Sequence, residues 1–284
     1  MPLVTLKEIL TKARRDRYAV GGFNFNGYED AQGIVDAAAV VKSPAILMLT
    51  QAACRHIGLH QAVGLANGMA KAVNIPICLH LDHATDPDFI KEAIKAGFSS
   101  VMVDASAKEY EANIDLTKEI VGFARSYGCS VEAELGKVGG KEDHIVVEDP
   151  ASALTLPSDV PRFVEETGID ALAIAFGSAH GFYKSEPRLN FERLGAILKV
   201  TDRPLVLHGG TGIPLADIQK CIAMGLAKIN IGTELKAIFS STLREICARL
   251  PDCLDPKEYM GPVKDAVAES VKEKLIAFGS ENKA

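Results

Sequence analysis

Eight short runs rich in apolar and β-branched residues alternate along the chain with longer segments whose apolar residues recur at helical spacing. Repeated strand–helix units predict a parallel sheet covered by helices, and continuous apolar strands fit a sheet that is buried on both faces. The expected strands are Ala19–Phe23, Ala45–Thr50, Ile77–Leu81, Ser100–Asp104, Ser130–Glu134, Ala171–Phe176, Pro204–His208 and Ala227–Ile231. Eight units in 284 residues favour an α/β fold of the closed (β/α)8 type, a TIM barrel. An open doubly wound sheet stays as the alternative, because periodicity does not report closure.

The eight units occupy most of the chain, so we expect one barrel domain over residues 1–284 with extra helices at its N- and C-terminal ends. The segment from Asp255 onward is predicted to form one or two helices beyond the eighth unit. The longest predicted loop covers residues 136–159, a length that is typical of a functional lid.

Composition excludes several classes of protein. The net charge of −6 and the pI of about 5.7 argue against binding to nucleic acid or to an anionic membrane surface. The six cysteines are scattered, without a CxxC pair, and are expected to be reduced thiols. The first residues lack the apolar core of a signal peptide, and no apolar stretch approaches a membrane span. These features predict a cytoplasmic protein.

Polar side chains fall at the carboxyl ends of the predicted strands, which all face one mouth of a parallel barrel. Histidines follow the third, sixth and seventh strands, and carboxylates lie at the ends of the third, fourth and fifth. Such a cluster is costly to bury without a partner, and three imidazoles with an open position are typical of catalytic zinc. We predict that His83, His180 and His208 bind Zn²⁺, against the alternative of three unrelated histidines. The other histidines away from the strands are expected to be ordinary residues: His56, His60 and His144.

Glycine-rich turns follow the seventh and eighth strands. The first is Gly209–Gly212 with Thr211, and the second is Asn230–Thr233. The turns after these two strands form the usual phosphate site of a TIM barrel, because glycine lets backbone N–H groups approach an anion closely. A single glycine turn would be ordinary loop geometry, but two such turns beside a metal site predict a phosphorylated substrate.

Motifs spread over nearly the whole chain resemble the class II, metal-dependent fructose-bisphosphate and tagatose-bisphosphate aldolases. They occur in family order: FNFN (Phe23–Asn26), HLDHA (His80–Ala84), DAS (Asp104–Ser106), VEAELG (Val131–Gly136), GGKED (Gly139–Asp143), GSAHGFY (Gly177–Tyr183), LVLHGGTG (Leu205–Gly212), KINIGTE (Lys228–Glu234) and DPKEYMGP (Asp255–Pro262).

The resemblance implies a retro-aldol enzyme that releases dihydroxyacetone phosphate. The three histidines match the family's zinc ligands, and Asp82 matches the residue that exchanges a proton with the C4 hydroxyl. Asp82 adjoins a ligand, which fits this role, although it could instead orient a histidine. Glu142 matches a carboxylate that moves the proton at C3. Asp104 and Glu134 match residues at a buried alternative metal position, although Glu134 could instead pair with a histidine or with Lys137.

The resemblance also implies a set of residues that hold the substrate and its phosphate, often with a monovalent cation (Na⁺ or K⁺) in support. This set is Asn24, Thr50, Gly181, Lys184, Gly209, Gly210, Thr211, Asn230, Ile231, Gly232 and Thr233. The family further implies a homodimer or homotetramer and, for some tagatose-type enzymes, an accessory subunit.

The sequence departs from the family pattern at three places. The resemblance implies that these places affect recognition of the half of the substrate far from C1. Gly232 stands where aspartate or alanine is common, Thr50-Gln51-Ala52 replaces Ser/Thr-x-Gly, and Lys257 replaces an arginine. A lysine lacks the bidentate fork of arginine. The configuration at C4 and the C6 group, whether phosphate, sulfonate or another, therefore stay open. A partner-dependent or non-catalytic subunit is one alternative, and another zinc barrel enzyme, such as a hydrolase or deaminase, is a second.

Overall fold

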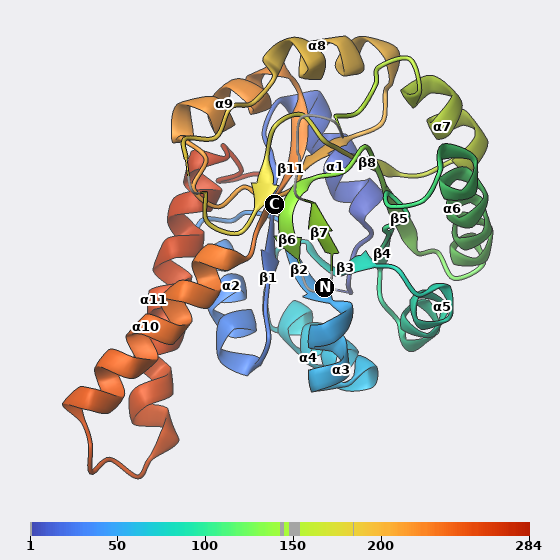
Figure 1. The fold of residues 1–284 in the computed structure, drawn as a ribbon. Coiled ribbons are helices and arrows are strands. Elements are labelled where there is room, and N and C mark those ends of the chain that lie inside the picture. The colour runs from blue at the N-terminus through green and yellow to red at the C-terminus, as the bar shows by residue number, and fades with distance from the viewer. Residues whose placement is uncertain (1, 143–144, 148–153, 184) are drawn as a thin grey trace.

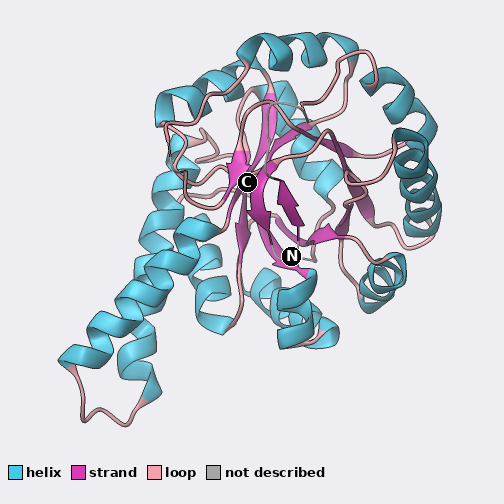
Figure 2. Ribbon diagram, viewed as in Figure 1, coloured by secondary structure: helices cyan, strands magenta, loops and turns pink. Residues whose placement is uncertain are grey.

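Eight parallel strands among the described residues close into a barrel, in a computed structural model that describes residues 2–142, 145–147, 154–183 and 185–284. For residues 141–142 and 145–147 it describes the backbone alone. The strands pair in the order β1-β11-β10-β8-β5-β4-β3-β2, and helices surround them (Figures 1 and 2). Closure confirms the TIM barrel and excludes the open sheet. No helix in the described part of the chain combines the length and the apolar character needed to cross a membrane.

The barrel strands match the predicted runs closely, and each is followed by at least one helix before the next. The strands are β1 (Val20–Asn24), β2 (Ala45–Thr50), β3 (Ile77–Ala84), β4 (Ser100–Val103), β5 (Ser130–Leu135), β8 (Ala171–Ile174), β10 (Leu205–Leu207) and β11 (Leu226–Ile231). The helices after them are α2 (Tyr28–Val40), α3 (Gln51–Ile57), α4 (Leu59–Ala72), α5 (Pro87–Ala96), α6 (Tyr110–Arg125), α7 (Val160–Thr167), α8 (Phe191–Val200), α9 (Leu215–Met224) and α10 (Thr233–Arg249).

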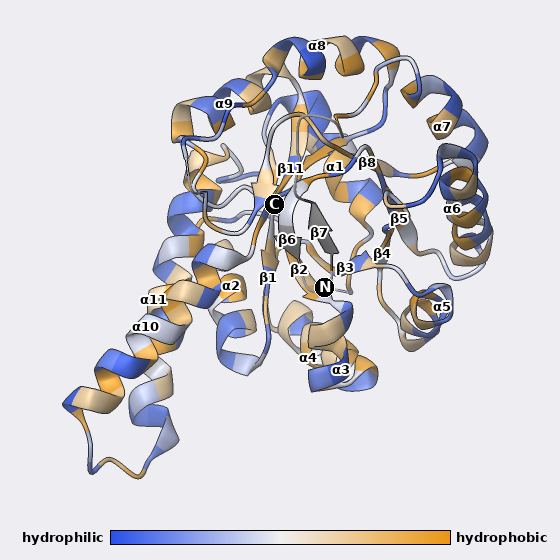
Figure 3. Cartoon of the chain, viewed as in Figure 1, coloured by the Kyte–Doolittle hydropathy of each residue, from blue (hydrophilic) through white to orange (hydrophobic). Residues whose placement is uncertain are grey.

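Two apolar cores hold the barrel together. The larger lies between the outer faces of the strands and the surrounding helices, which carry hydrophilic residues on the side away from the barrel (Figure 3). The smaller lies inside the barrel and continues into α1 (Leu6–Asp16), whose Leu6 and Leu10 are fully buried. Helix α1 begins at a Thr5–Glu8 capping box and contacts β1, β5, β8 and β11. The predicted N-terminal helix therefore closes one mouth of the barrel and leaves the other for function.

The C-terminal segment forms one long helix, α11 (Pro256–Ala277), which packs against α2 and α10. Together α10 and α11 extend beyond the barrel as an arm, at the lower left of Figure 1. The prediction of an extra C-terminal helix is confirmed. Leu254, in the turn that joins the two helices, is 93% exposed.

The long segment predicted as a loop contains a hairpin. Strands β6 (Gly139–Glu142) and β7 (Ile145–Val147) pair antiparallel, and β6 also pairs with β9 (Ala179–His180). The prediction of a loop was wrong for these residues, because the two runs are too short to be recognised as strands from their sequence. The consequence concerns the site: β6 pairs Gly140 with His180 and so brings residues after β5 to the open mouth.

Candidate metal centre and adjoining pocket

Three histidine side chains meet at the open mouth of the barrel. His83 lies on β3, His180 on β9, and His208 directly after β10. Their ring centroids lie 4.5 Å apart for His83 and His208, 4.7 Å for His83 and His180, and 5.8 Å for His180 and His208. One nitrogen from each ring lies within 4.8 Å of the other two, so a single ion can contact all three. Three imidazoles with an open fourth position are the donor set of catalytic zinc, and the residues fit that ion.

An irregular backbone at His83 explains how two consecutive residues both reach the mouth. Successive side chains of a regular strand point to opposite faces. His83 has a φ of +48°, in the left-handed region that residues other than glycine rarely adopt, and the β3–β4 register shifts between Leu81 and Ala84. The alternation is broken there, so Asp82 lines the pocket while His83 joins the histidine cluster. Strain of this kind concentrates at functional sites.

A second set of ligating groups shares His83 and lies beside the histidine cluster. Asp104 Oδ2 is 2.9 Å from His83 Nδ1, and Glu134 has an oxygen within 4.8 Å of ligand atoms on both. Glu134 Oε1 accepts a hydrogen bond from the Val138 amide at 3.2 Å, whereas its buried Oε2 has no partner among the described residues. A buried carboxylate oxygen without a partner is costly, and a cation would satisfy it. In the described part of the chain Glu134 forms no hydrogen bond with Lys137 or with a histidine, so the geometry favours the metal alternative.

Burial and neighbouring charges raise the pKa of His83 and of Glu134, and they lower the pKa of His208. Burial opposes the charged form of His83, but Asp82 and Asp104 outweigh it and raise the pKa of His83 to about 10. Burial and the charge on His83 lower the pKa of His208 to about 4. Burial and the neighbouring Asp104 raise the pKa of Glu134 to about 8. Positive charge is therefore favoured between His83 Nε2 and His208 Nδ1, which lie 2.6 Å apart, and a proton competes with a metal ion there.

Asp82 is held by two asparagines next to the histidines. Its Oδ2 accepts a hydrogen bond from Asn24 Nδ2 at 3.1 Å, and its Oδ1 accepts one from Asn230 Nδ2 at 3.2 Å. Burial opposes its ionisation, but neighbouring positive charge, chiefly that of His83, outweighs burial and holds the pKa of Asp82 below its ordinary value. Among the described residues, Asp82 has no hydrogen bond with a histidine. The carboxylate is therefore ionised and oriented, and it is free to accept a proton from a ligand in the pocket.

The pocket beside the histidines is lined by polar groups and glycines from several strand ends. Its lining residues are Asn24, Asp82, His180, Gly181, Gly209, Thr211, Asn230, Gly232 and Thr233. Thr233 begins α10, a helix of 17 residues, so the positive end of that helix dipole faces the pocket. Gly209 has a φ of +67°, and a Cβ there would lie 2.3 Å from the carbonyl oxygen of Ala179. The two predicted glycine turns therefore meet and form one concave site.

The hydroxyl of Tyr183 ties two of these turns together. It accepts a hydrogen bond from the amide of Ala179 at 2.8 Å and donates one to the carbonyl of Gly209 at 2.9 Å. Ala179 immediately precedes His180, and Gly209 immediately follows His208. Tyr183 therefore braces the histidine cluster and the glycine pocket at once.

Some predicted site residues lie elsewhere or outside the description. Thr50 caps α3, because its hydroxyl accepts a hydrogen bond from the amide of Ala53 at 3.3 Å. Ile231 is buried in the larger core, and a Cβ on Gly210 would lie 2.8 Å from a methyl group of Ile229. These three are not among the pocket-lining residues of the described chain. Lys184 and His144 lie outside the described residues, and for Glu142 only the backbone, in β6, is described.

Sequence reasoning assigned no role to a buried charged network beneath the histidines. Glu132 and Lys228 are both fully buried inside the barrel, with Lys228 Nζ 2.7 Å from Glu132 Oε2. Glu132 Oε1 lies 2.8 Å from His208 Nε2. The signal was present: Glu132 alternates with Glu134 on β5, and a lysine interrupts the apolar run of β11. Neither residue stands at a strand end, so neither belongs to the polar groups that the open mouth of a barrel predicts.

Comparison with known proteins decides the family. The family model "Fructose-bisphosphate aldolase class-II" matches residues 4–283. This chain belongs to the class II fructose-bisphosphate aldolase family. It is 45% identical, over the full length of both chains, to the fructose-bisphosphate aldolases of Staphylococcus epidermidis and Staphylococcus aureus. The crystal structure of the YdjI aldolase from Escherichia coli K12 superposes with a TM-score of 0.88 at 36% identity and covers 99% of each chain.

Membership gives the chain the activity of a class II aldolase, a carbon–carbon lyase acting on a sugar phosphate. Class II aldolases are zinc-dependent, and the cluster of His83, His180 and His208 is the candidate zinc site in this chain.

Proposed function

We propose that this protein cleaves fructose 1,6-bisphosphate or tagatose 1,6-bisphosphate, or a close analogue with a different C6 group, to dihydroxyacetone phosphate and an aldehyde. The observation that carries the proposal is the meeting of three histidines, an ionised Asp82 and a glycine-lined anion pocket at one mouth of the barrel. His83, His180 and His208 would hold zinc, which supplies a Lewis acid for the negative charge left when the C3–C4 bond breaks. Asp104 and Glu134, with His83, would hold the alternative metal position.

Asp82 is the base in this proposal. Cleavage requires removal of the proton from the C4 hydroxyl, and the base must lie within hydrogen-bond reach of that oxygen. The carboxylate of Asp82 lines the same pocket as His180 and is fixed by Asn24 and Asn230. Glu142 is proposed to move the proton at C3; its strand β6 pairs with β9, which carries His180.

The phosphate of the dihydroxyacetone end is proposed to bind at the two glycine turns and the N-terminus of α10. Thr211 and Thr233 line this pocket and can donate hydroxyl hydrogen bonds. Lys184 and a monovalent cation, Na⁺ or K⁺, are proposed to add positive charge there. Thr50, Gly210 and Ile231 do not line the pocket in the described chain. We propose that they support the substrate site through the backbone of the same strand ends.

Tyr183→Phe is expected to raise KM for the ketose bisphosphate by about tenfold and to change kcat less. The substitution leaves the Ala179 amide and the Gly209 carbonyl without their shared partner, and a lost hydrogen bond of this kind is worth about 1 kcal/mol. Steady-state kinetics with phosphorylated substrate measures both constants. Tyr127→Phe, at a tyrosine that is 51% exposed, serves as the control. Unchanged KM would show that the hydroxyl does not brace the pocket.

Substrate choice depends on the side of the pocket near Gly232. A Cβ at this position would lie 2.6 Å from Asn24 Oδ1, so the glycine leaves Asn24 in place to hold Asp82. The same glycine offers no side chain to the hydroxyls beyond C4. This supports tolerance of either configuration at C4, and both bisphosphates are therefore included in the proposal.

Chelation is expected to abolish cleavage, and added Zn²⁺ is expected to restore it. The test is a panel of ketose phosphates that varies the C4 configuration and the C6 substituent, with release of dihydroxyacetone phosphate as the readout. Full activity in excess chelator would exclude the metal mechanism. Zinc binding without turnover of any member of the panel would favour a partner-dependent subunit instead.

We also propose that the whole chain acts as one barrel domain, assembled as a homodimer or homotetramer in the cytoplasm, where glycolytic aldolases typically occur. Sedimentation of the purified protein tests the assembly. A requirement for an accessory subunit would appear as activity that the purified chain lacks and a cell extract restores.

A further inference from the structure

We propose that Glu132 and Lys228 are positioning residues, which fix His208 in the single tautomer that leaves Nδ1 available to zinc. The inference rests on the proposed metal site, but it does not depend on which ketose is cleaved. It concerns groups inside the barrel that do not line the pocket.

The contact between Glu132 and His208 sets the tautomer. Glu132 Oε1 lies 2.8 Å from His208 Nε2, and both side chains are fully buried. An ionised carboxylate has no proton to donate, so His208 must carry its proton on Nε2 and donate it to Glu132. The other nitrogen, Nδ1, faces His83 Nε2 at 2.6 Å, which is the side of the histidine cluster. A metal-binding histidine commonly donates its second ring N–H to a carboxylate in this way.

Lys228 holds Glu132 in place for this task. Its Nζ lies 2.7 Å from Glu132 Oε2, and its side chain is also fully buried. On the far side, Lys228 Nζ lies 3.5 Å from His80 Nε2, while His80 Nδ1 lies 2.8 Å from the hydroxyl of Ser100. With the Nδ1 proton directed to Ser100, His80 presents a lone pair to the ammonium group. One chain of contacts therefore runs from Ser100 on β4 through β3, β11 and β5 to His208.

A buried ion pair is a poor device for stability alone. Removing two charges from water costs more than their attraction usually returns, and replacing such a pair by apolar residues is often neutral or stabilising. Glu132 and Lys228 also pair in the barrel with apolar residues of the inner core, Met102 and Val206, so an apolar pair would have apolar neighbours there. What an apolar pair cannot supply is an acceptor for His208 Nε2. This difference separates a positioning role from a structural one.

Two double variants distinguish a positioning role of Glu132 and Lys228 from a purely structural one. Glu132→Leu/Lys228→Met removes both charges and the acceptor, whereas Glu132→Gln/Lys228→Met removes both charges but keeps an acceptor oxygen. Both remove the ion pair, so both should fold, which thermal unfolding of the full-length protein checks. Zinc affinity is measured by competition with a chromogenic chelator. We expect the Leu variant to bind zinc about 10- to 100-fold more weakly than wild type, and the Gln variant to lie within a few-fold of wild type.

Two spectroscopic readouts report the tautomer and the coordination directly. In the metal-free protein, ¹⁵N NMR of histidine side chains is expected to show His208 protonated on Nε2 in wild type and in the Gln variant, and a tautomer mixture in the Leu variant. The visible spectrum of the Co²⁺-substituted protein is expected to change in the Leu variant alone. A merely structural role would move neither signal.

The inference is overturned if the Leu variant binds zinc as tightly as wild type with an unaltered Co²⁺ spectrum. It is also overturned if both double variants lose affinity equally, because the acceptor would then be irrelevant. Wild-type protein that binds no zinc would remove the proposed function itself. Wild-type zinc binding together with equal binding by the Leu variant would remove only the role of Glu132 and Lys228.

Discussion

His208→Ala is expected to leave the purified protein without stoichiometric zinc and to lower the cleavage rate of a ketose bisphosphate by about 10³-fold or more. His208 is fully buried, with Nδ1 toward His83 and Nε2 toward Glu132. Alanine leaves two imidazoles, which is one fewer than a catalytic zinc site uses. It also leaves Glu132 Oε1 without the His208 nitrogen that lies 2.8 Å away. Metal analysis of the dialysed protein and a coupled assay for dihydroxyacetone phosphate measure the two effects.

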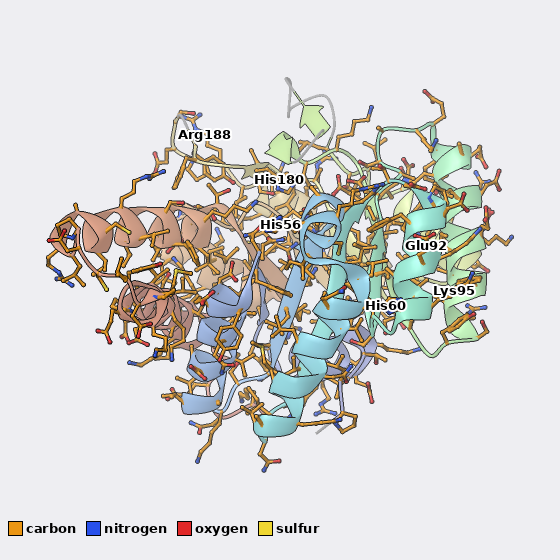
Figure 4. The ribbon with its side chains drawn as sticks, turned by 90° about the horizontal axis from the view of Figure 1, so that it is seen from below. His56, His60, Glu92, Lys95, His180 and Arg188 are labelled. Atoms are coloured by element: carbon orange, nitrogen blue, oxygen red, sulfur yellow. The ribbon has the colours of Figure 1, made fainter. Side chains whose placement is uncertain are left out.

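The matched control is His60→Ala, at an exposed histidine on α4. Figure 4 shows His60 on that helix beside α5, which carries Glu92 and Lys95. This variant is expected to keep full zinc content and full activity. Far-ultraviolet circular dichroism shows whether His208→Ala is folded. If folded His208→Ala retained stoichiometric zinc, the ion would lie elsewhere, and the set of His83, Asp104 and Glu134 would be the first alternative.

The fold was predictable because its signals are local and repeated. Each barrel strand is an apolar run, and each is followed by at least one amphipathic helix, so the order of elements alone implied a parallel sheet. Closure was a further step: it depends on the pairing of β1 with β11, which are far apart in the chain. Periodicity carries no information on that pairing, and only the number of units favoured it.

The position of the candidate site was predictable to the extent that its residues stand at strand ends. Parallel strands bring His83 and His208 to one mouth whatever the details of packing. His180 was harder, because it reaches the cluster from β9, a two-residue strand outside the barrel that pairs with β6. The left-handed backbone at His83 was not predictable, because a positive φ is uncommon for every residue except glycine, histidine included.

The interior charges were missed for a different physical reason. Hydrophobic patterning treats a lysine in an apolar strand as an outward-facing residue, because an unpaired ammonium group is almost never fully buried. Lys228 is buried only because Glu132, 96 residues earlier in the chain, lies beside it. A single sequence contains both residues but not their contact. Pairings of this kind become visible only when the barrel has closed.

Asp82→Asn is expected to keep zinc and fold while lowering kcat by about 10²- to 10⁴-fold. The amide is close to isosteric with the carboxylate but is not a base. In the native site Asn24 and Asn230 both donate a hydrogen bond to the Asp82 carboxylate. The side-chain amide that replaces this carboxylate has only one oxygen, so its N–H₂ group would face one of these two donors, which is unfavourable. Asn230 can resolve this conflict, because its Oδ1 is buried without a hydrogen-bond partner among the described residues. A flip of its side chain lets that oxygen accept from the new amide.

Comparing Asp82→Asn with His208→Ala distinguishes loss of the base from loss of the metal ion. Both variants are expected to lose turnover, but only His208→Ala is expected to lose metal. Equal loss of zinc from both would mean that Asp82 supports the ion instead of accepting the proton of the C4 hydroxyl. Retention of more than about a tenth of wild-type kcat by Asp82→Asn would exclude general-base catalysis at this carboxylate. Asn24 and Asn230 hold the Asp82 carboxylate, and no hydrogen bond joins it to a histidine in the part of the chain that the structure describes. We therefore expect zinc content and turnover to separate in this variant.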